Sequence, residues 1–176
     1  MTEILLNDTL AFTYPVVRKG ESCPLIWDLR DPPSSAAQLV PYGQKHSTSF
    51  KFLQSQFATS PRVTGLYILC DLLPYPWKIS ARNQKGVTVG DVLEAIYQVA
   101  RTPLTTEEWD RLPSKQRQRV NRVFDVRWTN ASAPEKERNR GLKRVDCLLQ
   151  STRFAGLSMS YDDDFTCILT LSRNLD

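Results

Sequence analysis

A change of hydrophobic period near residue 88 constrains the fold of this chain more than any other feature of its sequence. Before it, residues 77–82 alternate apolar and polar side chains, which is typical of a strand with one solvated face. After a turn at 83–86, apolar side chains recur at spacings of three and four residues, which is typical of a helix that buries one face. Thr88 can cap this helix. The pattern predicts a strand, a turn and an amphipathic helix with an apolar stripe of Val89, Val92, Leu93, Ile96 and Tyr97.

Other stretches of the chain also have strand character. Residues 25–30 alternate apolar and polar side chains, and residues 65–71 form an apolar run. Residues 154–160 and 165–171 are apolar runs that flank the three consecutive aspartates 162–164. Two such runs with a short acidic connection predict a β-hairpin.

Capping signals divide the segment after residue 104 into further helices. Thr105 and Glu108 have the spacing of a capping box, which predicts a short helix over 105–112. Ser114 can cap the next helix. Pro134 begins a charged piece that Gly141 can terminate in a left-handed conformation. The middle helix carries a short apolar stripe, namely Val120, Val123 and Phe124.

These elements predict an α+β fold. A chain of 176 residues is close to the usual size of one domain, so we expect a single compact domain over 1–176, with an antiparallel or mixed sheet packed against three to four helices. Residues 38–61 are rich in Gln, Ser, Thr and Gly, and we expect a long surface loop or insertion there.

The cysteines and the N-terminus bear on location. Cys23, Cys70, Cys147 and Cys167 show no CxxC spacing, which excludes a zinc ribbon. Three of them sit in apolar runs, which favours reduced core thiols over a disulfide or a reactive thiol. The N-terminus lacks the basic region of a signal peptide, and no run of apolar residues is long enough to span a membrane. We therefore expect a cytoplasmic protein, with the nucleus as an alternative.

No catalytic, metal or cofactor motif stands out. His46 lies in a polar stretch and is more simply a solvated residue than a catalytic base. The aspartates 162–164 lack the ligand spacing of a calcium loop, and phosphate-binding glycine motifs are missing. Asp28 could pair with Asp31 or Asp146 as in a hydrolase, but an ion pair with Arg30 is the simpler reading for Asp28, as is one with Arg144 for Asp146. We therefore predict no cofactor, no metal and no catalytic set.

Positive charge is concentrated in one segment. Residues 111–144 hold eleven basic and three acidic side chains, a net charge of +8, whereas the rest of the chain has a net charge of −4. Such a surface is most simply a solvated helical face, but it can also dock an acidic protein partner or bind nucleic acid. Nucleic acid is the less favoured partner because no nucleic-acid-binding motif accompanies the charge. The candidate docking face is Arg117, Arg119 and Arg122.

Three separated motifs resemble an uncharacterised family of fungal domains that is common in mushroom-forming fungi. They are residues 26–33, a WDLRDPP motif preceded by Ile26; residues 87–97, VTVGDVLEAIY; and residues 144–157, which carry RVDCLL and TRFAGL. The similarity extends over about residues 23–172. Within this range, residues 38–61 do not match the family pattern. The resemblance implies a one-domain α+β protein and supplies no activity or catalytic residue.

The leading hypothesis from the sequence is a noncatalytic protein-interaction or binding module. The alternative is an enzyme or small-ligand protein with a pocket formed where the WDxR and RVD…TRF motifs meet, lined by Trp27, Asp28, Arg30, Asp146 and Arg153. Binding of a polyanion such as nucleic acid through the basic segment is the third hypothesis. Oligomeric state has no signal in the sequence.

Overall fold

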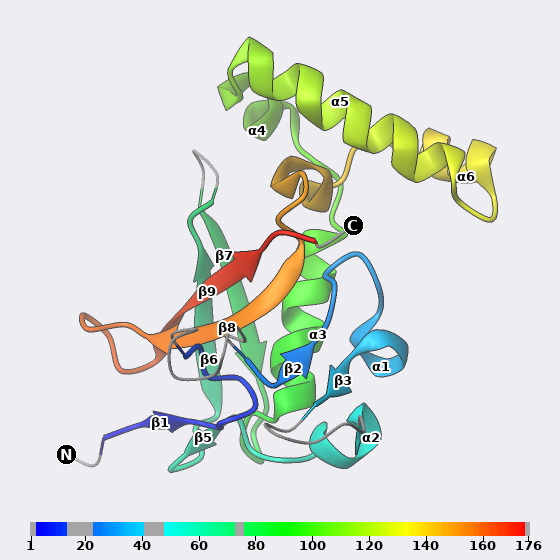
Figure 1. Cartoon of the computed structure of the whole chain (residues 1–176). Coiled ribbons are helices and arrows are strands. Elements are labelled where there is room, and N and C mark those ends of the chain that lie inside the picture. The colour runs from blue at the N-terminus through cyan, green and yellow to red at the C-terminus, as the bar shows by residue number, and fades with distance from the viewer. Residues whose placement is uncertain (1–2, 14–22, 41–47, 73–75, 175–176) are drawn as a thin grey trace.

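A mixed four-stranded sheet with one helix packed on it contributes to the main core of the protein. The computed structural model describes residues 3–13, 23–40, 48–72 and 76–174 (Figure 1). In the sheet, β6 (Gly65–Cys70) pairs antiparallel with β7 (Trp77–Arg82) and parallel with β9 (Thr166–Ser172). The other edge is β8 (Arg153–Met159), antiparallel to β9, so the order is β7-β6-β9-β8. The α+β fold in one compact domain, the mixed sheet and the C-terminal hairpin are confirmed.

The central helix has the face that its sequence predicts. α3 (Val89–Ala100) begins at a capping box in which the Thr88 hydroxyl accepts from the Asp91 amide and the Asp91 carboxylate accepts from the Thr88 amide. Its apolar side chains pack into one core with those of the four-stranded sheet. Tyr97 is half-buried at the margin of this core.

Short elements surround this core. The described residues outside the main sheet form two small sheets, β1-β5 and β2-β3-β4, and several helices. Their bounds are β1 (Leu5–Leu6), β2 (Leu25–Ile26), α1 (Pro33–Ala36), β3 (Gln38–Leu39), β4 (Thr48–Ser49), α2 (Phe50–Leu53), β5 (Thr59–Ser60), α4 (Thr106–Arg111), α5 (Ser114–Thr129), α6 (Pro134–Asn139) and the 3₁₀ helix η1 (Arg144–Leu148). No helix among the described residues is long and apolar enough to cross a membrane.

Two expectations about the N-terminal half are wrong. The strand expected over 25–30 ends at Ile26, because Asp28 turns the chain and its side chain accepts a hydrogen bond from the Arg30 amide. The segment 38–61 is not simply a surface loop, since its described part contains β3, β4, α2 and β5. Phe50, Leu53 and Ala58 of this segment are buried in the main core. Residues 41–47, which include His46, lie outside the described residues.

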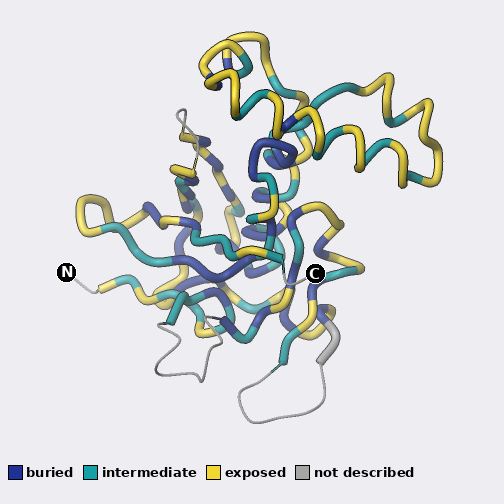
Figure 2. Tube along the Cα trace, turned by 45° about the horizontal axis from the view of Figure 1, so that its top comes forward, coloured by how far each residue is buried: buried dark blue, intermediate teal, exposed yellow. Residues whose placement is uncertain are grey.

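Helices α4, α5 and α6 form an arm beside the sheet, which we call the helical arm (residues 106–139). Figure 1 shows α5 passing above η1, with α4 near one of its ends and α6 near the other. Figure 2 shows that most of this arm is exposed. Val120 is the fully buried residue of α5, and it packs with Leu112 and Cys147 in a small second core. The expected stripe is therefore only partly core, because Val123 and Phe124 are half-buried.

The ends of the arm helices agree with the sequence except at one point. The Thr105–Glu108 capping box is present at α4, and Gly141 follows α6 with a φ of 74°. The expected cap at Ser114 is wrong. Pro113 occupies the N-cap position of α5 without a side-chain cap, and Ser114 is already helical, because proline fixes a φ suited to a helix start.

Gly156 allows the N-terminal segment to lie directly on β8. Its φ is +125°, and a Cβ built there would lie 2.6 Å from both the backbone N and the Cα of Phe12. The same close approach is secured by hydrogen bonds from the Phe12 amide to the Leu157 carbonyl at 2.8 Å and from the Leu157 amide to the Leu10 carbonyl at 2.7 Å. Only glycine fits this position.

We expect Gly156→Ala to lower the free energy of unfolding by roughly 2 kcal/mol or more, because it adds both backbone strain and a clash with main-chain atoms. Gly65→Ala is the matched control, since a Cβ at Gly65 meets nothing within 4 Å. It should remain within about 1 kcal/mol of the wild type. Urea unfolding of both variants measures the difference, and equal stabilities would contradict this account.

Candidate binding cleft

The WDxR and TRF motifs meet in the fold. The Leu29 amide donates to the Thr152 carbonyl at 2.9 Å, and the Phe154 amide donates to the Trp27 carbonyl at 2.8 Å. The rings of Trp27 and Phe154 are 6.0 Å apart between centroids, and both side chains are buried. The indole Nε1 of Trp27 donates to the Asp31 carbonyl at 2.9 Å. This junction is a packed joint between two segments that are distant in sequence.

Asp28 is held within this joint. Its carboxylate accepts from Arg30 Nε at 2.9 Å and Arg30 Nη2 at 2.7 Å, and from Thr152 Oγ1 at 3.1 Å. Burial raises the pKa of Asp28, but the hydrogen bonds and charge of Arg30 outweigh it, so the net pKa is lowered. Asp28 is thus an ionised group occupied by its partners. Arg153 begins β8 beside it as a half-buried residue, and its guanidinium has no carboxylate partner among the described residues.

Asp146 belongs to a different group of side chains. Its carboxylate is 1% exposed and accepts from Arg127 Nε at 2.7 Å and Arg127 Nη2 at 2.8 Å, and from the Lys143 amide at 2.8 Å. Arg127 Nη2 also donates to the Gly141 carbonyl at 3.0 Å. Burial by itself lowers the pKa of Arg127, but its contacts with Asp146 and Glu137 raise it overall. Of the five residues predicted to line one pocket, four lie at the joint between the WDxR and TRF motifs. The fifth, Asp146, lies elsewhere and is bound to Arg127.

Four further ion pairs involve Glu137 of α6 and Glu108 of α4. Glu137 of α6 bonds to both Arg127 and Lys143 and accepts from Arg140 at 3.3 Å. Arg144 Nε donates to Glu108 Oε1 at 2.8 Å, and the other oxygen of Glu108 accepts from the Thr105 amide at 2.9 Å. The Arg144–Glu108 pair stands apart from the other pairs. We call the linked side chains of Arg127, Glu137, Lys143 and Asp146 the ion network, and Arg140 lies at its exposed edge.

The three arginines of the expected docking face do not act together. Arg117 is occupied: its Nε donates to the Trp109 carbonyl at 3.1 Å, its Nη2 donates to the Asp110 carbonyl at 2.7 Å, and its guanidinium lies 5.5 Å from the centroid of the Trp109 ring. It fastens α5 to α4. Arg119 and Arg122 are exposed and have no ion pair within the described part of the chain.

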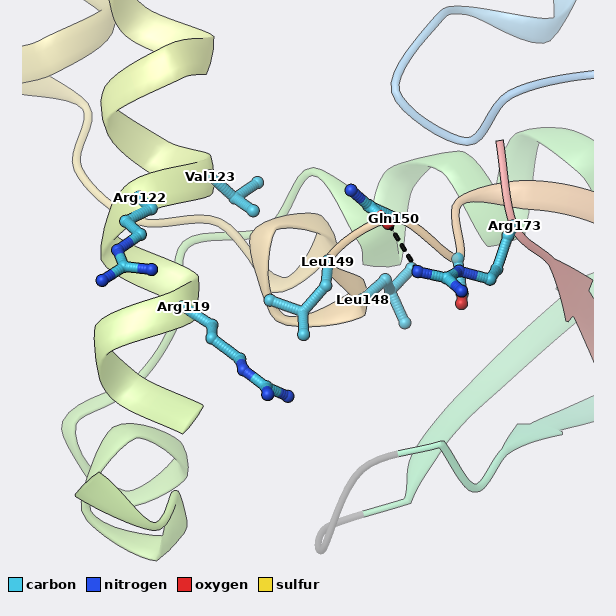
Figure 3. A pocket seen from close by; sticks show the side chains of 8 residues that line it. Arg119, Arg122, Val123, Leu148, Leu149, Gln150 and Arg173 are labelled. Atoms are coloured by element: carbon cyan, nitrogen blue, oxygen red, sulfur yellow. Dashed lines mark hydrogen bonds between the residues drawn. The ribbon is translucent and has the colours of Figure 1, made fainter. Parts of the chain in front are cut away.

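Arg119 and Arg122 instead line a cleft of about 460 Å³ between α5 and the segment that follows η1. Arg173, just beyond β9, is a third guanidinium at this cleft, and it donates to Gln150 Oε1 at 2.8 Å. Figure 3 shows Arg119 extending from α5 below Leu149, Arg122 with its guanidinium directed away from this turn, and Arg173 on the other side of the turn. We call this site the arginine cleft; its lining is Arg119, Arg122, Val123, Leu148, Leu149, Gln150, Ser151 and Arg173.

The backbone at the floor of the arginine cleft is strained. Leu149 has φ 56° and ψ −114°, and it is the only non-glycine residue with positive φ among the described residues. The Ser151 amide donates to the Leu148 carbonyl at 2.9 Å, so Leu149 takes the first central position of a turn with type II′ angles, a position that usually holds glycine. Such strain costs roughly 1–3 kcal/mol and is concentrated at functional sites.

Metal-binding clusters and the cysteines are the other groups of the described residues to consider. No group of three or more His, Cys, Asp or Glu side chains in the described ranges could hold a metal ion. The four cysteines are buried, and Cys70, Cys147 and Cys167 are free thiols. Burial raises the pKa of both Cys147 and Cys167 to about 12, which keeps these thiols protonated at neutral pH.

Sequence reasoning missed most of the arginine cleft. No sequence pattern indicates Arg173 and Gln150, because they are far from residues 119–123 in the chain and only the fold brings them to the same cleft. Leu149 has no sequence signal either, since leucine is not a residue type that indicates a positive φ. Only Arg119 and Arg122 had a signal, the local excess of positive charge.

Comparison with known proteins assigns the chain to a family but gives it no activity. The model of a family described as "Family of unknown function (DUF6699)" matches residues 25–164. No curated protein and no solved structure matches the chain.

We expect Arg127→Met to lower the free energy of unfolding by about 3–5 kcal/mol, because it leaves the carboxylate of Asp146 buried without its cation. Arg140→Ala is the matched control: it also touches the ion network, but half of its side chain is exposed. It should cost less than about 1 kcal/mol. Urea unfolding distinguishes the two, and similar small losses would show that the buried carboxylate of Asp146 does not depend on Arg127 as its partner.

The ion network also predicts an acid-sensitive contribution from Glu137. The hydrogen bond from Lys143 is the largest cause that lowers the pKa of Glu137 below its usual 4.5. A lowered folded-state pKa means that stability is fully present above the usual value and is lost as the pH falls through the folded value. Glu137→Gln should therefore flatten the dependence of unfolding free energy on pH below about 4.5. Urea unfolding across this range measures it; parallel curves for variant and wild type would contradict it.

Proposed function

The chain belongs to the family of unknown function DUF6699, and we propose from its geometry that it is a noncatalytic binding module whose arginine cleft takes an acidic segment of a partner protein. The observation that carries this proposal is that Arg119, Arg122 and Arg173 line one cleft and have no carboxylate partner among the described residues.

The charge of the basic segment supports a specific docking point rather than a uniform face. Arg127, Lys143 and Arg144 are neutralised by the carboxylates of Glu137, Asp146 and Glu108. Arg117 is turned onto backbone carbonyls of α4. Arg119 and Arg122 lack such partners, so their guanidiniums remain able to bind external carboxylates, for which their fork of donors is well suited.

The surroundings favour a protein segment over nucleic acid. Base stacking needs free aromatic faces, but in the helical arm Trp109, Phe124 and Trp128 each carry an arginine at 5.5, 5.3 and 5.1 Å from the ring centroid. The arginine cleft itself offers aliphatic side chains, Val123, Leu148 and Leu149, beside its cations. A peptide with both acidic and apolar side chains matches this combination.

The polar groups elsewhere support a noncatalytic role. Asp28 and Asp146, the carboxylates that an enzyme pocket would use, are both taken by arginines and backbone or hydroxyl donors. A general base needs a free lone pair directed at its substrate. The buried free thiols of Cys70, Cys147 and Cys167 support a reducing compartment, which we propose to be the cytoplasm or the nucleus.

We expect the protein to bind a labelled peptide of alternating glutamate and leucine residues, and to bind the matching glutamine–leucine peptide much more weakly. Arg119→Ala with Arg122→Ala should weaken the acidic peptide about tenfold or more, because two charge-assisted contacts are lost. Binding should also fall as salt is added, since the charges are exposed. Fluorescence anisotropy titration measures all three effects.

The control is Lys78→Ala with Lys85→Ala, which removes two exposed positive charges from β7 and the turn before α3. It should bind the acidic peptide nearly as well as the wild type. Equal weakening in both double variants would mean that net charge alone drives binding, and unchanged binding after loss of Arg119 and Arg122 would refute the proposal.

A further inference from the structure

The hairpin of β8 and β9 carries opposite charge at its two ends. Its open end supplies part of the arginine cleft, with Gln150 and Ser151 just before β8 and Arg173 just after β9. Its closed end is the turn Tyr161–Phe165, which contains three consecutive aspartates and which we call the acidic turn. Figure 1 shows this turn projecting from the sheet on the side away from α5.

The acidic turn is exposed, and hydrogen bonds of Asp163 hold its backbone. Tyr161 is fully exposed, and Phe165 is 48% exposed. Asp163 serves the turn itself, since its carboxylate accepts from the Thr166 hydroxyl at 2.6 Å and the Phe165 amide at 3.0 Å, and these bonds lower its pKa. Asp162 and Asp164 are exposed and make no side-chain ion pair with any described residue. The turn thus presents two carboxylates between two exposed aromatic rings.

We propose that the acidic turn of one copy docks in the arginine cleft of a second copy, so that the protein associates with itself head to tail. This inference rests on the proposed function of the arginine cleft and names its partner. Asp162 and Asp164 are complementary to Arg119 and Arg122 in charge. Tyr161 and Phe165 are apolar surfaces that suit the aliphatic side chains of Val123, Leu148 and Leu149.

The two surfaces cannot meet within one molecule. The turn and the cleft lie at opposite ends of strands of seven residues each, Arg153–Met159 and Thr166–Ser172. At about 3.3 Å per residue, these strands hold the two ends roughly 20 Å apart. The hairpin is also the edge of the main sheet and is paired along β6, so it does not fold back on itself. Contact between the turn and a cleft is therefore intermolecular.

The shape of the turn favours docking because little order has to be created. The hydrogen bonds of Asp163 hold the turn before binding, and a preformed binding element loses less conformational entropy. The contact uses two different surfaces, so each copy retains a free cleft at one end and a free turn at the other. Such heterologous contacts produce open chains or closed rings rather than isolated twofold dimers.

The strength of the association should depend on salt. Exposed ion pairs are individually weak and are screened at high ionic strength. We expect the weight-average mass of the full chain, measured by sedimentation equilibrium, to rise with concentration at low salt and to return to the monomer value in concentrated sodium chloride. A wild-type protein that stays monomeric at every concentration and at low salt overturns the inference.

Two charge-neutralised variants locate the contact. Arg119→Gln with Arg122→Gln removes the charge of the cleft, and Asp162→Asn with Asp164→Asn removes the charge of the turn. Each double variant alone should be monomeric under conditions in which the wild type associates. All four side chains are exposed, so circular dichroism and the unfolding midpoint should stay at wild-type values. Undiminished self-association of either variant overturns the inference.

A mixture of the two variants gives the sharper test. The cleft variant keeps its turn and the turn variant keeps its cleft, so one contact between the two remains possible and no further copy can add. The mixture should therefore reach the mass of a dimer and stop, and a mixture that stays monomeric counts against the inference.

The labelled glutamate–leucine peptide separates this inference from the proposed function. The turn variant should bind it as the wild type does. If the peptide binds but the wild type does not self-associate, the self-docking fails and the proposed function stands; if the peptide does not bind either, both fail.

Discussion

The buried bond between Arg127 and Asp146 is the interaction on which the position of the helical arm depends. α5 is a polar helix with one fully buried side chain, Val120, so apolar packing alone holds it weakly. Arg127 joins it to η1 through Asp146 and to α6 through Glu137. A buried ion pair adds little net stability once desolvation is counted, but its geometry is narrow. Its main effect is therefore to place α5, and with it Arg119 and Arg122, opposite the turn at Leu149.

The same bond explains why a strongly basic segment is not a uniformly basic surface. Several of its cationic side chains are paired inside the fold. They bind carboxylates in the ion network and in the Arg144–Glu108 pair, or donate hydrogen bonds to the carbonyls of α4. Its aromatic rings are covered by guanidiniums in the same way. What remains available is local, at the arginine cleft. Net charge over a stretch of sequence thus overstates the charge that a partner meets, because pairing across the fold is invisible in the local count.

The motifs that resemble other sequences have a structural role, because their side chains join segments that are distant in the chain. The WDxR segment and the segment around Thr152 are joined by backbone hydrogen bonds, by Asp28 and by the packing of Trp27 on Phe154. Asp28 and Arg30 bind each other and stabilise the turn at the end of β2. A joint between two distant segments needs these particular side chains whether or not a ligand binds nearby. The enzyme pocket suggested by the same residues would require Asp146 as well, and Asp146 is committed to Arg127.

Local interactions are what the sequence by itself determined. The alternation at 77–82, the capping boxes at Thr88 and Thr105, the end of α6 at Gly141 and the β8–β9 hairpin all depend on residues within a few positions of one another, so their patterns predict them. In the segment 38–61, the polar composition predicts a loop, but Phe50, Leu53 and Ala58 are buried because distant core residues cover them. Only the tertiary structure decided the arginine cleft. Arg119, Leu149 and Arg173 come from three separate stretches, and no local rule brings a helix, a strained turn and a strand end to one place.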